Sequence, residues 1–394
     1  MKILLKLLKQ TANIIVLSFL MVNIMNTASN SLIAAEFQKG MCYATWDKDS
    51  FGTPQSEEAL KMLKNMGVEY VQINVTEYQN TYNSTTIKAT DLTPSVESIK
   101  TAIKVAHKLG LKVMLKPHID LIDNVDGTYW RADIGFNTEE DWQTWFKQYE
   151  QFITKYARIA AETNTEIFSV GTELSFTTQR SDHWKNIIAS VKKVYNGKLI
   201  YAANWDEYRQ IQFWENLDYV GIDAYFPLTY KENPTIEDIK QGWEKWRIEI
   251  ETFATEVSKP IIFTELGYAS TLTAASEPWA NAKTGNADTI LQANCYKAFF
   301  ETIWKCPWLK GVYWWHFSPT VNGGGINNRQ FTPLNKPSAD ILKQHYTDRT
   351  SSINAGLTKE IDSKFDMLNK KTSFNKDGLY SIKEKKDKDR KINN

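Results

Sequence analysis

The stretch Glu166-Ile-Phe-Ser-Val-Gly-Thr-Glu-Leu-Ser175 decides the fold of this chain and points to its chemistry. Positions 167–170 are mostly apolar and β-prone, which predicts a short buried strand. A glycine and a threonine end the strand, and Glu173 follows where the strand reaches the surface. A carboxylate at the tip of a hydrophobic strand costs free energy unless it is paired or used. Glu173 is therefore a candidate functional residue.

A second stretch, Pro260-Ile-Ile-Phe-Thr-Glu-Leu-Gly267, has the same design. Glu265 follows an apolar strand here, so two strands far apart in the chain each end in Thr-Glu-Leu. A single glutamate in this position is usually solvated or caps the next helix, and an isolated motif is weak. Two glutamates in matching contexts, with many aromatic residues also following strands, predict that Glu173 and Glu265 carry the chemistry.

Eight apolar, strand-like runs alternate with helical patterns from about residue 36 onward. The helices have start signals: Thr53-Pro54 places proline at a first helical position, and both Asn137 with Glu140 and Thr235 with Asp238 resemble capping boxes. The predicted strands are 41–46, 70–75, 112–115, 167–170, 199–203, 219–223, 261–264 and 311–315.

Strict alternation of strands and helices favours a parallel sheet with crossover helices. Eight such units in the 315 residues from 36 to 350 fit a single α/β domain, a closed (β/α)8 TIM barrel, better than an open doubly wound sheet. No glycine-rich phosphate loop follows the first strand, where Met41-Cys-Tyr-Ala-Thr-Trp46 leads into Asp47. The signature of a dinucleotide-binding fold is therefore missing. We predict one catalytic domain over 36–350.

The two ends of the chain lie outside the predicted barrel. Residues 1–35 combine early lysines, an apolar run at 14–25 too short to span a bilayer comfortably, and small residues, which is the pattern of a secretory signal peptide. Cleavage is expected after Ala35, with Ala28 as the competing position and an uncleaved anchor as the alternative. Residues 351–394 are highly charged at their end and predict a solvated, disordered tail, with a partner-binding tail as the alternative. We therefore expect a secreted or periplasmic protein that has no stable membrane association once the signal peptide is cleaved.

Composition argues against several classes of partner. A formal net charge of +1 gives no reason to expect nucleic acid or an acidic membrane. The three cysteines, Cys42, Cys295 and Cys306, do not make a disulfide framework. A bridge between the last two stays open, but buried thiols are favoured. Five histidines without Cys/His spacing predict no metal site, and no cofactor is expected.

The active site of such a barrel lies at the carboxyl ends of its strands. Those ends carry carboxylates among indole, phenol, amide and imidazole groups, without the thiols, phosphate nests or serine elbows of other chemistries. Sugars fit this set, because a pyranose packs its C–H face on aromatic rings while its hydroxyls take hydrogen bonds. Cleaving a glycosidic bond needs an acid and a second carboxylate. The residues concerned are Trp46, Lys116, His118, Asp120, Trp130, Arg131, Glu173, Asn204, Trp205, Asp206, Asp223, Tyr225, Glu265, Trp314, Trp315 and His316.

Several motifs resemble those of a known family. They are Lys116-Pro-His-Ile-Asp120, Ser169-Val-Gly-Thr-Glu-Leu174, Ile222-Asp-Ala-Tyr225, Phe263-Thr-Glu-Leu-Gly267, Tyr313-Trp-Trp315 and the closing Phe331-Thr-Pro-Leu-Asn-Lys-Pro337. Together they look like glycoside hydrolase family 113, a member of the clan A retaining enzymes. The resemblance covers roughly residues 38–346. It implies a (β/α)8 barrel and β-mannanase activity on β-mannan or a related polysaccharide or oligosaccharide.

The resemblance also implies roles for particular residues. Glu173 would be the acid/base and Glu265 the nucleophile, Tyr225 would hydrogen-bond that nucleophile, and Trp315 would floor the subsite where the bond breaks. Most clan members have asparagine just before the acid/base, where this chain has Thr172. This departure weakens assignment to the common cellulase-like families and is compatible with an axial 2-hydroxyl, as in mannose. The predicted substrate-binding set is Trp46, His118, Asn204, Trp205, Tyr225 and Trp315.

Other functions stay open at this point. The same barrel would also serve an exo-acting β-mannosidase, a glucanase or a xylanase. A secreted carbohydrate-binding protein without catalysis is an alternative from a different class. A metal-dependent hydrolase would use His118, Asp120 and Asp223. A monomer is expected in each case.

Overall fold

The computed structural model describes residues 37–124, 128–280, 285–321 and 323–348. The predicted signal peptide, 1–35, and the predicted tail, 351–394, lie outside the described residues. Within the described ranges, no helix combines the length and the apolar character needed to cross a membrane.

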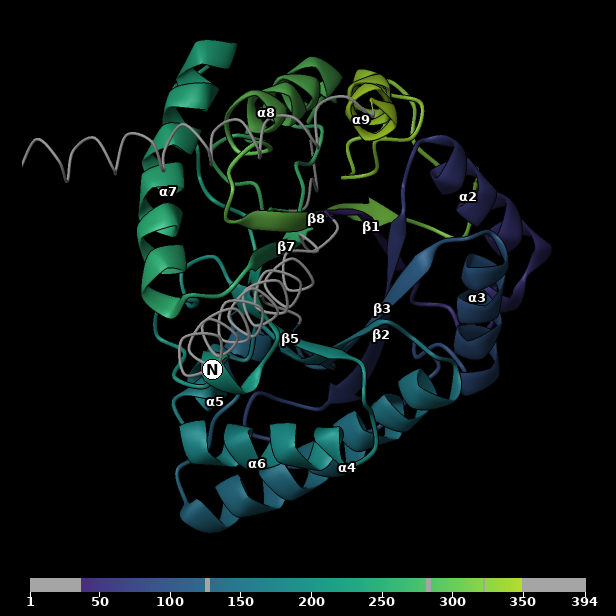
Figure 1. The fold of residues 1–394 in the computed structure, drawn as a ribbon, viewed down its shortest axis with the longest axis vertical. Helices are drawn as coiled ribbons and strands as arrows, with labels where there is room; N and C mark the ends of the chain where they lie inside the picture. The colour runs from purple at the N-terminus through teal and green to yellow at the C-terminus, as the bar shows by residue number, and fades with distance from the viewer. Residues whose placement is uncertain (1–36, 125–127, 281–284, 322, 349–394) are drawn as a thin grey trace, which may run out of the picture. The chain divides into compact units, whose positions relative to one another are not determined.

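Eight parallel strands close into a barrel in chain order (Figure 1), which confirms the predicted TIM barrel. Each predicted strand is present. The strands are β1 (Gln38–Ala44), β2 (Tyr70–Gln79), β3 (Lys112–Leu121), β4 (Ile167–Thr172), β5 (Lys198–Asn204), β6 (Tyr219–Asp223), β7 (Ile261–Leu266) and β8 (Leu309–Phe317).

Strands β2 and β3 run well beyond their predicted ends at residues 75 and 115. They stay in register from Tyr70 opposite Lys112 to Gln79 opposite Leu121. The added residues are largely polar, so the apolar pattern that marks the first half of each strand does not reveal them. Main-chain pairing extends both strands at their carboxyl ends, and the added residues place polar side chains at the rim of the barrel.

The barrel is surrounded by helices that connect consecutive strands (Figure 1). Thr53 caps α2 with proline at the first position, and Thr235 with Asp238 forms the predicted capping box of α7. The capping box predicted for Asn137 with Glu140 is wrong by one residue, because Thr138 accepts the amide of Asp141 instead. The helices are α2 (Pro54–Asn65), α3 (Val96–Lys108), α4 (Glu139–Glu162), α5 (Ser175–Thr178), α6 (Ser181–Lys192), α7 (Ile236–Val257), α8 (Thr289–Thr302) and α9 (Pro337–Thr347), with short 3-10 turns η1 (Ser50–Gly52), η2 (Arg131–Asp133) and η3 (Trp214–Asn216).

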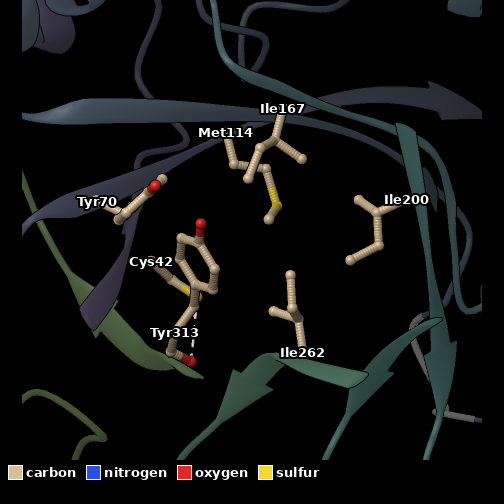
Figure 2. Close-up of a cluster of buried hydrophobic side chains, with 7 residues drawn as sticks. All are labelled: Cys42, Tyr70, Met114, Ile167, Ile200, Ile262 and Tyr313. Atoms are coloured by element: carbon tan, nitrogen blue, oxygen red, sulfur yellow. Dashed lines mark hydrogen bonds between the residues drawn. The ribbon is translucent and has the colours of Figure 1, made fainter. Parts of the chain in front are cut away.

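Apolar side chains fill the interior of the barrel (Figure 2). Every strand contributes to this cluster, and most of its members lie in the first half of their strands. Gly40 is needed here, because a Cβ at this position would lie 2.4 Å from the ring of Tyr313. The amino-terminal half of the barrel is therefore closed by packing, and the carboxyl ends are left to polar groups. The cluster comprises Cys42, Tyr70, Met114, Ile167, Ile200, Ile262 and Tyr313, with Tyr219 packed against it from β6.

Tryptophans on the helices join the barrel to its outer layer. Trp184 of α6 packs edge-on against Tyr201 of β5 with ring centroids 5.2 Å apart. Trp142 and Trp145 of α4 are also buried, so the tryptophans of both helices serve packing. Cys295 is a buried thiol, and Cys306 donates to the Thr302 carbonyl oxygen at 3.6 Å, so the two cysteines are not bridged.

Candidate active site

The two predicted glutamates are both buried at the carboxyl end of the barrel. Glu173 follows the last residue of β4, has a left-handed backbone with φ of 51°, and is 6% exposed. Its N–H donates to the Ala202 carbonyl oxygen of β5 at 2.8 Å. Glu265 lies inside β7 opposite Asp223 of β6 and is 5% exposed. A positive φ in a residue other than glycine is uncommon and marks a functional or strained position.

Both carboxylate oxygens of Glu265 accept a strong hydrogen bond. Lys116 donates Nζ–H to Oε1 at 2.7 Å, and Tyr225 donates its hydroxyl to Oε2 at 2.7 Å. The second contact is the one that the family resemblance implies. The carboxylate is thereby held in one orientation, with one oxygen against a cation and one against a phenol.

Lys116 is fully buried and reaches across the barrel. It extends from β3, which is no neighbour of β6 or β7 in the sheet, and binds both oxygens of Asp223 at 3.0 Å. Burial disfavours its ammonium form, yet the carboxylates of Asp223 and Glu265 hold the pKa of Lys116 above its ordinary value. One cation thus compensates two buried carboxylates.

Glu173 is paired with Arg131 from η2. Arg131 donates Nη1–H to Glu173 Oε2 at 2.6 Å and Nη2–H to Asp120 Oδ2 at 3.2 Å. Burial raises the pKa of Glu173, the Arg131 charge opposes that rise, and the negative charge of Glu265 adds to it. The two glutamates therefore act on each other electrostatically, and Glu173 has the raised pKa expected of a proton donor.

His118 lies beside the pair as a neutral ring. Burial lowers its pKa well below the ordinary value, and the charges of Lys116 and Arg131 act in the same direction. Its Nε2 is 2.9 Å from the side-chain amide nitrogen of Asn74, which donates to it. The 4.0 Å separation between Nε2 and Glu265 Oε1 is consequently not an ion pair.

The residues of the metal-dependent alternative have separate partners. Asp120 binds Arg131, His118 binds Asn74, and Asp223 binds Lys116 with both oxygens. In the described part of the chain, no group of three or more His, Cys, Asp and Glu side chains is arranged to hold a metal ion. The charged residues at the barrel rim are instead paired with one another.

The three tryptophans predicted to bind the substrate all keep exposed surface. Trp46 is 45% exposed and lies edge-on to His316 at 5.9 Å. Trp315 is half-buried, and its peptide bond to His316 is cis. Trp205 is half-buried and stacks on the exposed Trp279 with centroids 5.8 Å apart and planes 10° from parallel. Indole faces therefore stand at the ends of β1, β5 and β8.

A small apolar cluster connects two of these indoles with Tyr225. It consists of Tyr225, Ala269 and Phe331, and both Trp205 and Trp315 pack against it. The phenol that binds Glu265 is therefore supported by the aromatic residues around it.

Asn204 and Thr172 make their hydrogen bonds to nearby residues and not to the two glutamates. The half-buried side chain of Asn204 donates Nδ2–H to Asp206 at 2.8 Å, so it contacts neither glutamate through a hydrogen bond. Thr172 is buried, and its hydroxyl is 3.5 Å from the Pro117 carbonyl oxygen. The position that departs from the wider clan therefore packs toward β3.

The sequence interpretation placed Lys116 and Arg131 at the strand ends but did not identify them as the cations that hold the glutamates. Lys116 lies in the part of β3 beyond its predicted end, where every residue from 116 to 119 is buried. Arg131 comes from a loop, where its partner cannot be read from spacing. The structure also shows a buried carboxylate at Glu207 that the sequence interpretation did not single out.

The structure is a closed (β/α)8 barrel with two glutamates at the carboxyl ends of two strands and indole rings around them. This combination is typical of a glycoside hydrolase. The model of Glycoside Hydrolase Family 113 matches residues 41–332. The chain belongs to this family and is a glycoside hydrolase.

Three solved structures are similar to the chain over 80% of its length. The complex structure of a GH113 β-1,4-mannanase has 27% sequence identity, a TM-score of 0.73 and is covered completely. The GH113 β-mannanase AaManA from Alicyclobacillus acidocaldarius, in complex with ManMIm, has 25% identity, a TM-score of 0.73 and 98% coverage. A further GH113 β-1,4-mannanase structure has 28% identity and a TM-score of 0.72, again with 100% of that chain covered. No protein with a curated description matches by sequence.

Proposed function

We propose that this glycoside hydrolase is a secreted, retaining endo-β-1,4-mannanase that cleaves mannan or glucomannan by double displacement. The observation that carries the proposal is the contrast between two buried glutamates. Glu265 is held by Lys116 and Tyr225, while Glu173 has a raised pKa. The β-1,4-mannanase structures to which the chain is similar support the choice of sugar.

In the first step, Glu265 attacks the anomeric carbon of the mannosyl unit. A bond forms between that carbon and a carboxylate oxygen, and the bond to the departing glycosidic oxygen breaks. Glu173 gives its proton to that oxygen, so the leaving chain departs as an alcohol. Lys116 and Tyr225 orient the attacking carboxylate, and Lys116 stays paired with Asp223 when Glu265 becomes an ester.

In the second step, water releases the sugar. Formation of the ester removes the negative charge of Glu265, which is one cause of the raised pKa of Glu173. Glu173 is then better suited to be an anion, and Arg131 stabilises that form. The carboxylate takes a proton from water, the water oxygen bonds to the anomeric carbon, and the ester bond to Glu265 breaks.

The aromatic residues around the pair are proposed to bind the polysaccharide. Trp315 would lie under the sugar at the cleavage point, and Trp46 and Trp205 would pack against neighbouring units. His118 and Asn204 would contribute hydrogen bonds to hydroxyl groups. Because the substrate is neutral, binding through ring faces and hydrogen bonds agrees with the near-zero net charge of the chain.

The function is tested by incubating the protein with mannan, glucomannan, cellulose and xylan. We expect mannooligosaccharides from the first two, a fall in viscosity before reducing ends accumulate, and the β-anomer as the first product seen by proton NMR. Release of mannose alone would identify an exo-acting β-mannosidase, and products from cellulose or xylan alone a different glycanase. Binding without hydrolysis would leave a carbohydrate-binding protein, and loss of activity with a chelator would favour the metal-dependent alternative.

Secretion is proposed from the lysines, apolar run and small residues of positions 1–35. Amino-terminal sequencing of protein recovered from the medium or periplasm should begin at Glu36. Protein that retains Met1 in the membrane fraction would contradict this part of the proposal.

A further inference from the structure

Glu207 is a buried carboxylate in the turn after β5, 3% exposed. In the described part of the chain, no lysine, arginine or histidine forms an ion pair with it. It accepts hydrogen bonds instead, among them those from the Thr178 hydroxyl at 2.9 Å, the Tyr201 hydroxyl at 3.2 Å and the Asn204 N–H at 3.1 Å. The Ser175 side chain is a further hydrogen-bond partner. A carboxylate without a cation is costly to bury, and these donors offset part of that cost.

Two of these donors lead directly to Glu173. The Tyr201 hydroxyl that donates to Glu207 accepts the N–H of Leu174 at 2.9 Å, and Leu174 is the residue after Glu173. Thr178 ends α5, the short helix that starts two residues after Glu173. Glu207 is thus connected through Tyr201 to the backbone just after Glu173, and it binds Thr178 at the end of the segment that continues from it.

The ring of Tyr201 leaves its hydroxyl little freedom. It is fully buried between Trp184 and Phe213, with centroids 5.2 Å and 5.5 Å away. A Cβ at Gly171 would lie 2.7 Å from this ring, so β4 passes in close contact with it just before Glu173. The hydrogen bond to Leu174 therefore comes from a rigid group on the neighbouring strand.

Two residues of β5 consequently hold the backbone of Glu173 and of the residue after it. Its own N–H donates to Ala202, and the next N–H donates to Tyr201. These two contacts fix the backbone where φ is 51°, a conformation that few side chains adopt without support.

We propose that Tyr201 and Glu207 are positioning residues for Glu173, acting through two hydrogen bonds in series that hold the acid/base in its left-handed backbone conformation. This inference rests on the proposed function, since it takes Glu173 as the acid/base. Neither residue touches the substrate. Their effect is to keep the Glu173 carboxyl aimed at the departing oxygen.

The test compares two substrates that differ in their need for an acid. Mannan has a poor leaving group that must be protonated, whereas 2,4-dinitrophenyl β-mannobioside has a leaving group that departs without a proton. Tyr201→Phe removes only the hydroxyl and keeps the ring packing. We expect this variant to lower kcat/KM on mannan by about 10- to 100-fold, as for a misplaced catalytic group. On the dinitrophenyl substrate, kcat/KM should change by less than about threefold, because bond cleavage there does not depend on the acid.

Glu207 is tested by a disruptive and a conservative change. Glu207→Leu should show the same substrate-dependent loss as Tyr201→Phe. Glu207→Gln keeps the shape and an acceptor oxygen, so it should retain most of the activity on mannan. Tyr195→Phe is the matched control, because it removes a buried hydroxyl that binds Thr165 before the opposite end of β4. It should leave both substrates unaffected.

Equal loss on the two substrates, or no loss on either, for Tyr201→Phe would overturn the inference. Glu173→Ala is measured in parallel. If Glu173→Ala itself loses activity equally on both substrates, the proposed role of Glu173 is wrong. If Glu173→Ala shows the substrate dependence and Tyr201→Phe does not, only the positioning inference is wrong.

Discussion

The segments 172–174 and 264–266 have the same sequence, Thr-Glu-Leu, and different surroundings. Glu265 lies within β7 and faces Lys116, a fully buried cation shared with Asp223. Glu173 lies just beyond β4 on a left-handed backbone and faces Arg131, which is partly exposed. The same local sequence thus places a carboxylate at the rim in both segments, while the cation that each carboxylate meets comes from another strand or loop.

The largest effect is expected from removing Glu265, the proposed nucleophile. Glu265→Ala should lower kcat on mannan by at least about 10⁴-fold, since no other group can form the glycosyl ester. Steady-state hydrolysis of mannan measures the effect. Glu97→Ala, an exposed glutamate of α3, is the control and should retain full activity. Activity within tenfold of the wild type would remove Glu265 from the nucleophile role.

Removing the cation on the β7 side should have the next largest effect. Lys116→Met leaves Asp223 and Glu265 buried without compensation, so we expect a loss of stability of about 3–5 kcal/mol. We also expect kcat/KM on mannan to fall by about 10²–10³-fold, as when a preorganised donor is lost. Chemical denaturation and hydrolysis rates provide the two measurements.

Lys61→Met tests whether burial is the reason for this effect. Lys61 pairs with Glu57 and Glu58 on the exposed surface of α2, where solvent screening leaves an ion pair little effect on stability. An equal loss of stability in the two lysine variants would show that the shared buried cation is not what distinguishes the β7 side.

Removing the cation on the β4 side should act mainly on the pH profile. Arg131 opposes the rise in the pKa of Glu173, so Arg131→Met should raise that pKa further. The acid form then persists to higher pH, and the basic limb of the kcat/KM profile should move to higher pH. A loss of about tenfold in kcat is expected as well, because the ionised form loses a charged hydrogen bond. A basic limb that stays in place or moves to lower pH would contradict the assignment.

The last prediction concerns Glu207 and is an effect on stability, with no change in catalytic rate expected from it. Burial raises the pKa of Glu207 from 4.5 to about 7, so the folded state holds this proton more tightly than the unfolded state. Its contribution to stability is present below the ordinary pKa and is lost as pH rises toward 7. The stability advantage of the wild type over Glu207→Gln should therefore shrink by up to about 3 kcal/mol between those pH values.

Denaturation curves of both proteins at several pH values measure this difference. Glu97→Gln serves as the control for removing a carboxylate at an exposed position. A difference between wild type and Glu207→Gln that stays constant with pH would contradict the raised pKa.

Much of the site was predictable because strands of a parallel barrel end at the same rim. Glu173, Glu265, Tyr225 and the rim tryptophans follow apolar runs, so their positions came from periodicity together with family motifs. The hydrogen bond of Tyr225 to Glu265 agrees with the resemblance. Lys116 was harder to recognise, because a lysine beside a predicted strand is normally solvated.

Local sequence patterns were enough to predict the barrel, its eight strands and the end of the barrel at which the two glutamates lie. These follow from local patterns of apolar residues and from the geometry that parallel strands share. Only the tertiary structure decided the partners: which cation lies against each glutamate, why His118 is neutral, and how Glu207 reaches the backbone beside Glu173. The two cation contacts join residues 42 positions apart, for Arg131 with Glu173, and 149 positions apart, for Lys116 with Glu265, and burial sets their strength. Local sequence predicts neither the cation partner of each glutamate nor how deeply the pair is buried.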